Sequence, residues 1–157
     1  MLPTTMEREI AFTIMDVARM LKTLADQRVR PYGMTRAQWA VLVRLDRSEG
    51  LKQAELAEML DLQPITLTRL LDRLAQNGLI ERRADPNDRR ANRLFLTPAA
   101  RPLLERLSEL GNDVMGTVLV GLDGKAIERL LHDLERLREN LRGAINRDSL
   151  QPEVASG

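Results

Sequence analysis

The sequence predicts a mainly α-helical fold that contains one small β-hairpin. Apolar residues recur at helical spacing along most of the 157 residues. One stretch, 79–97, instead reads as a strand, a turn at Asp85-Pro86-Asn87-Asp88 and a returning strand. Apolar residues make up 43% of the chain, which is enough for a core, and a chain of this length fits a single fold over 1–157.

The first helix is expected over 7–30, with residues 1–5 loose. Its apolar residues step by four and three along one stripe, namely Ile10, Ile14, Val17 and Leu21. A second helix follows, because Thr35 and Gln38 form a capping box in front of a segment that carries Trp39.

Two further short helices precede the hairpin within the lobe expected over 35–97. Asp61 lies between them, where glycine is common, and aspartate can adopt the left-handed turn conformation. Pro64 suits the first turn of the second of these helices, and its apolar stripe is Leu67, Leu70, Leu71 and Leu74. Two short helices followed by a β-ribbon form a winged helix-turn-helix unit. Such a unit places its second helix in the major groove of DNA and can place the ribbon tip in a minor groove.

Positive charge is concentrated in this same part of the chain. Residues 62–101 contain eight arginines and four acidic residues, a net +4, whereas the whole chain carries only +1. The arginines are Arg69, Arg73, Arg82, Arg83, Arg89, Arg90, Arg93 and Arg101. Segregated charge on the elements that would meet phosphates favours nucleic-acid binding.

The residues of the second helix that point away from its apolar stripe are expected to contact DNA. They are Pro64, Ile65, Thr66, Thr68, Arg69 and Arg73. Arg69 has the chemistry for a bidentate pair with guanine. At the hairpin tip, Asp88 is expected to accept hydrogen bonds from Arg89 or Arg90 and so fix one arginine for the minor groove. Asp88→Asn would then weaken binding. The alternative is a flexible loop whose charges act only by long-range attraction, and in that case Asp88→Asn would strengthen it.

A second helical region is expected over 98–146, starting with Thr97 as N-cap and Pro98 as the first helical residue. Its last helix has an apolar seam formed by Leu130, Leu134, Leu137 and Leu141. Residues 147–157 are expected to form a disordered tail. The two terminal seams fit either burial within one chain or packing against a second copy.

The order of these pieces resembles the MarR family of bacterial regulators, and most of all its SlyA-like branch. The resemblance covers about 10–141, and the matching runs are TRAQWAVL, QAELAEML, LLDRLAQNGLIERR, DPNDRRANRLFLT and LTPAARPLLERL. It implies a homodimer that binds a pseudo-palindromic operator on double-stranded DNA as a transcriptional regulator, expected to be a repressor.

The resemblance also implies a small aromatic or lipophilic effector, bound between the dimer helices and the DNA-binding lobe. For an aromatic carboxylate, Arg19 and Lys22 offer cations and Trp39 offers a ring on which to stack. The alternative is that Trp39 belongs to the core and that the two cations form a solvated face.

The composition argues against other classes of protein. Without cysteine the chain has no disulfide, zinc finger or thiol nucleophile, and His132 is its single histidine. We therefore expect no catalytic residues, no metal site and no cofactor.

The sequence has no signal peptide and no apolar run long enough to span a membrane, so a cytoplasmic protein is expected. A winged protein-interaction module is the alternative function, and the arginine-rich hairpin favours DNA.

Overall fold

A computed structural model describes residues 5–150, and the chain forms two compact units with their boundary after Val118. The first unit contains five of the helices and a three-stranded sheet, and the second contains the last helix. This architecture confirms the predicted fold class, a mainly helical winged helix-turn-helix flanked by helices.

In the first unit, α1 (Thr5–Val29) begins two residues earlier than the sequence predicted. Its N-terminal 16 residues, 5–20, are exposed, whereas its C-terminal end contacts α2 and α5 and buries Val29. A 3-10 turn, Arg30–Tyr32, leads to α2 (Arg36–Arg47). The predicted capping box is confirmed, since the Thr35 side chain accepts from the Gln38 N–H and the Gln38 side chain accepts from the Thr35 N–H.

Two short helices follow α2, as the sequence predicted. They are α3 (Gln53–Met59) and α4 (Pro64–Gln76). Asp61 between them has φ of 51°, which confirms its left-handed conformation. At the end of α4 the left-handed residue is Gly78, with φ of 72°, and not Asn77.

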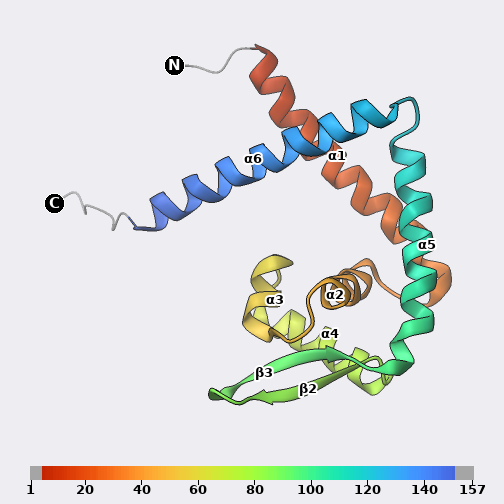
Figure 1. The fold of residues 1–157 in the computed structure, drawn as a ribbon, viewed down its shortest axis with the longest axis vertical. Coiled ribbons are helices and arrows are strands. Elements are labelled where there is room, and N and C mark those ends of the chain that lie inside the picture. The colour runs from red at the N-terminus through yellow and green to blue at the C-terminus, as the bar shows by residue number, and fades with distance from the viewer. Residues whose placement is uncertain (1–4, 151–157) are drawn as a thin grey trace. The chain divides into compact units, whose positions relative to one another are not determined.

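The hairpin consists of β2 (Ile80–Asp85) and β3 (Asp88–Leu96), paired antiparallel with a register shift between Ala84 and Asp85. The sequence did not predict the third strand, β1 (Leu51–Lys52), which pairs with β3 and gives the order β1-β3-β2. We call β2, β3 and the turn between them the wing. Figure 1 shows α2, α3 and α4 gathered on one side of the wing.

The chain leaves the wing through a 3-10 turn, Pro98–Ala100, before α5 (Arg101–Val118). Thr97 precedes the turn as predicted, but its hydroxyl donates to the Gly78 carbonyl and caps no helix N–H. Because the α-helix restarts at Arg101, Pro102 lies in its first turn, where a missing N–H costs little.

One hydrophobic core holds the first unit together. It joins α2, α3, α4, the wing and α5, and its fully buried side chains include Leu42, Leu45, Leu56, Leu67, Leu71 and Leu94. The spacing of the leucines on α4 predicted one buried face, and Leu67, Leu71 and Leu74 are indeed buried. On the opposite face, Ile65 is 60% exposed.

The second unit is the single helix α6 (Gly124–Leu150), capped by Asp123, whose carboxylate accepts from the Ala126 N–H. Residues 147–150 are helical, so the disordered tail predicted from 147 is wrong for these four positions. Positions 151–157, like positions 1–4, lie outside the described residues. Over the described part of the chain, no helix is both long and apolar enough to cross a membrane.

Candidate nucleic-acid interface

The exposed face of α4 carries most of the residues that the sequence assigned to DNA contact. Pro64, Ile65, Thr66, Arg69 and Arg73 are all exposed, whereas the leucines at 67, 71 and 74 are buried beneath them. The helix therefore presents apolar, hydroxyl and guanidinium groups on one accessible surface. These are the groups that read thymine methyls, base edges and phosphates in a major groove.

Thr68 differs from its neighbours because its hydroxyl is already occupied. It accepts a hydrogen bond from Gln53 Nε2 at 2.8 Å and donates one to the Pro64 carbonyl at 2.9 Å. Gln53 is the first residue of α3, so this side chain ties the two helices of the helix-turn-helix together. No local pattern in the sequence indicates this contact, because the two partners lie 15 residues apart.

Four of the eight arginines in 62–101 are paired with acidic side chains of the same unit. Arg82 donates from β2 to Asp72 of α4 at 2.7 Å, and Arg101 pairs with Asp46 at 3.3 Å. Arg83 pairs with Glu81 and lies over the Phe95 ring, 4.1 Å from its centroid. The fourth, Arg93, pairs with Asp85 at 3.2 Å.

The other four arginines have no acidic partner among the described residues. Arg69 and Arg73 lie on α4, and Arg89 and Arg90 lie at the wing tip. All four are exposed. Acidic neighbours neutralise the other four arginines of residues 62–101. The unpaired positive charge therefore lies at two places, the outer face of α4 and the tip of the wing.

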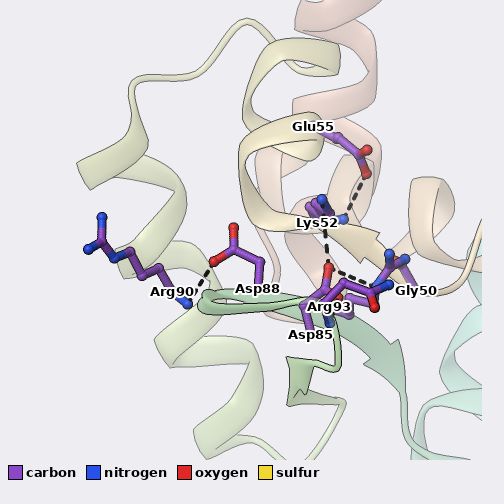
Figure 2. Close-up of polar contacts among 8 residues, drawn as sticks. Gly50, Lys52, Glu55, Asp85, Asp88, Arg90 and Arg93 are labelled. Carbon is purple, nitrogen blue, oxygen red and sulfur yellow. Dashed lines mark hydrogen bonds and ion pairs between the residues drawn. The ribbon is translucent and has the colours of Figure 1, made fainter.

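Asp88 organises the wing tip differently from the expectation. Its Oδ1 accepts from the backbone N–H of Arg90 at 3.0 Å, and no bond to an arginine side chain is present among the described contacts. Figure 2 shows the Arg90 side chain extending away from the ribbon. Asp88 thus fixes the backbone of the tip, as an Asx-type turn does, and leaves both guanidinium groups accessible.

The most enclosed charged group in the wing is Asp85, which the sequence treated only as a turn residue. Its side chain is fully buried. Oδ1 accepts from the Asn87 N–H at 2.9 Å, and Oδ2 lies 3.2 Å from Arg93 Nε and 3.6 Å from Lys52 Nζ (Figure 2). The Asn87 N–H and then the two cations hold the pKa of the Asp85 carboxyl below its ordinary value, against the opposing effect of burial.

Trp39 lines a cavity of about 730 Å³ between α2 and α5. Its indole N–H is buried without a hydrogen-bond partner. The Nε atom of Arg36 is also buried without a hydrogen bond, but it forms an ion pair with Asp26 at 3.5 Å. The predicted effector residues are not brought together. Neither Arg19, which pairs with Asp16 at 3.0 Å, nor Lys22 lines this cavity. The basic residues that do line it come from α2, namely Arg36, Arg44 and Arg47.

His132 lies on α6 with an exposed side chain, 3.5 Å from Asp133. Within the described residues, no three histidine, aspartate or glutamate side chains are grouped so as to hold a metal ion.

The helix pair α3–α4, the exposed face of α4 and the arginine-tipped wing define a winged helix-turn-helix protein. Residues 34–91 match the model of the MarR family. A transcriptional regulator named PA3341 is 32% identical over 85% of this chain and 98% of its own, with a TM-score of 0.77. The chain belongs to the MarR family.

Two further solved structures agree with this assignment. A MarR transcriptional regulator from Methanosarcina mazei Go1 is 25% identical, with 87% of this chain and 99% of the other covered and a TM-score of 0.79. Wild-type MarR from E. coli in its apo form is 26% identical, with coverage of 87% and 97% and a TM-score of 0.72. The protein therefore has the fold of MarR-family transcriptional regulators, which are not enzymes.

Proposed function

We propose that this protein binds double-stranded DNA in a sequence-specific way and regulates transcription, acting as a repressor in the cytoplasm. The observation that carries the proposal is the placement of the four unpaired arginines. Two lie beside Ile65 and Thr66 on the exposed face of α4, and two lie at the wing tip. Side chains on α4 would read base edges, while one of the two wing arginines would enter an adjacent minor groove and the other would contact the DNA backbone.

A second copy of the chain is the partner that we propose for the two apolar seams. On α1, Ile10, Ile14 and Val17 are 44–51% exposed. On α6 the exposed seam consists of Leu130, Leu134, Leu137 and Leu141. Leaving such stripes in water is unfavourable, and a two-fold dimer would cover both. It would also suit a pseudo-palindromic operator, with α4 helices about 34 Å apart.

Selection of bound sequences from random DNA tests the DNA-binding proposal most directly. We expect a pseudo-palindrome, and an affinity for it that falls steeply with added salt. Replacing Leu134 and Leu137 with aspartate should give monomers that bind this site weakly. The alternative function, a winged protein-interaction module, requires that the selection enrich no sequence.

We also propose that a small aromatic carboxylate lowers the affinity for DNA by binding beside Trp39. The buried, unpaired indole N–H and the basic residues of α2 support this position. A contribution of Arg19 and Lys22 to effector binding stays a prediction, which their alanine variants test. Trp39 is the single tryptophan, so quenching of its fluorescence by a salicylate-like compound reports binding. Unchanged fluorescence and unchanged DNA affinity at millimolar ligand would exclude the effector.

The SlyA-like branch is a further proposal within the MarR family. Its support is the run 77–97, which contains Asp88-Arg89-Arg90 at the wing tip. An operator closely related to those of that branch, obtained from the same selection, is the result that we expect.

A further inference from the structure

Asp85 is one of two buried polar residues among those that the structure describes, and the other, Gln38, belongs to a capping box. A carboxylate taken out of water is costly unless charged and hydrogen-bonding groups surround it. The position is also unusual in the strand, because the register of the hairpin shifts between Ala84 and Asp85. The chain thus turns the Asp85 side chain into the protein just before the wing tip.

The groups that surround Asp85 come from three separate parts of the chain (Figure 2). Asn87 belongs to the turn, Arg93 to the returning strand and Lys52 to β1. Arg93 also donates from Nη1 to the carbonyl of Gly50 at 3.0 Å, so it joins the wing to the segment before α3. The wing is therefore fixed at its distal half as well as at its base.

Lys52 extends this connection to the helix-turn-helix. It is the residue that precedes α3, and its backbone N–H donates to Glu55 Oε2 at 2.9 Å. Gln53, the next residue, hydrogen-bonds Thr68 of α4. Lys52 thus links the Asp85 carboxylate to the start of α3, and its chain neighbour Gln53 links that start to α4.

We propose that Asp85 is a positioning residue for DNA binding, which holds the wing tip in one orientation relative to α3 and α4. This inference rests on the proposed DNA-binding function. Arg89 and Arg90 follow Asp85 by only four and five residues, so a fixed Asp85 limits the directions in which they can point. Orienting the two arginines before DNA arrives reduces the entropy lost on binding.

The test uses Asp85→Asn in two backgrounds, the native chain and a chain that carries Arg89→Ala and Arg90→Ala. Asparagine can still accept from the Asn87 N–H, but it leaves Arg93 and Lys52 without a counter-charge. In the native background we expect about tenfold weaker binding to the selected operator. In the double-alanine background we expect no further loss, because side chains that act as a unit are non-additive.

Two controls separate positioning from general damage. Asp46→Asn breaks an exposed pair with Arg101 outside the wing and should leave the affinity for DNA unchanged. Circular dichroism and thermal melting establish that each variant is folded at the assay temperature. Should Asp85→Asn fail to fold, Lys52→Met removes the more distant cation and should give a smaller loss, again only in the native background.

Hydroxyl-radical footprinting gives an independent readout. In Asp85→Asn the minor-groove protection beside the operator should fade, while contacts of α4 in the major groove persist. Unchanged affinity in the native background, or an equal loss in both backgrounds, would overturn the positioning role. If the native protein itself selects no DNA, the proposed function fails, and that result is distinct from either of these.

Discussion

Helix α4 and the wing present arginines in contrasting ways. On α4, Arg69 and Arg73 are exposed because they lie on the face opposite the buried leucines, and neither has an acidic partner among the described residues. On the wing, Arg82, Arg83 and Arg93 are engaged by acidic or aromatic neighbours, and only the tip keeps unpaired cations. Local periodicity thus predicts that these two helix arginines are exposed, whereas cross-strand and long-range partners determine which arginines of the ribbon stay unpaired.

The largest effect should come from the buried side of α4. Leu71 is fully buried, so Leu71→Ala should lower the free energy of unfolding by about 2–5 kcal/mol, through lost burial and the cavity left behind. Urea denaturation measures the loss. Ile65→Ala on the opposite, exposed face is the matched control and should change stability by less than about 0.5 kcal/mol. Equal losses at the two positions would contradict the division of α4 into two faces.

Arg69 distinguishes base reading from phosphate contact on that helix. Arg69→Ala should cost about 1–3 kcal/mol on the preferred operator and relax the preference at one base pair. Fluorescence anisotropy with a panel of single-substitution operators provides both numbers. A loss of the same size on every duplex would instead assign Arg69 to the backbone.

Within the wing, a free arginine can be compared with a paired one. Arg89→Ala should reduce the slope of log affinity against log salt by about one per protomer, since one cation that offsets phosphate charge is lost. Arg83→Ala is the matched variant, because Glu81 and Phe95 already hold that side chain. It should leave the slope almost unchanged. Similar slopes for the two variants would contradict the assignment of free and paired cations.

Asp85 should make stability depend on acid pH. Because its carboxyl has a pKa below the ordinary 3.8, it stabilises the folded state above that value. The contribution is lost as the pH falls from about 3.8 through the lower, folded-state pKa. Thermal melts between pH 6 and 2, compared with those of Asp85→Asn, measure the difference. A steeper acid-induced decline in the variant than in the native protein is the contrary result.

The smallest effect concerns Asp88, and here the structure reverses the expectation for Asp88→Asn. Asparagine retains a carbonyl oxygen that can accept from the Arg90 N–H and removes one negative charge near DNA. Binding should therefore strengthen slightly, most visibly at low salt. Asp88→Ala also removes the charge but loses the hydrogen bond, so it should bind more weakly than Asp88→Asn. Identical affinities for the two variants would show that the backbone bond at the tip is unimportant.

The sequence by itself determined the helical elements and the identity of the exposed α4 residues. The capping box at Thr35 and Gln38, Pro64 at a helix start and the left-handed Asp61 depend on contacts within a few residues, which periodicity and local side-chain chemistry specify. The four free arginines were all among the residues predicted to contact DNA. The strand β1 was missed because two residues carry too little pattern to identify a strand.

Only the tertiary structure decided which charges are neutralised and which polar groups are buried. Asp85 reads in sequence as one more turn residue, yet its partners Lys52 and Arg93 lie 33 and 8 residues away and meet it only when β3 pairs with both β1 and β2. Likewise the cavity beside Trp39 is completed by residues of α5, such as Leu104 and Gly111, and not by Arg19 or Lys22. Such contacts form only when segments that are separate in the sequence pack together. The spacing of residues along the chain therefore does not predict them.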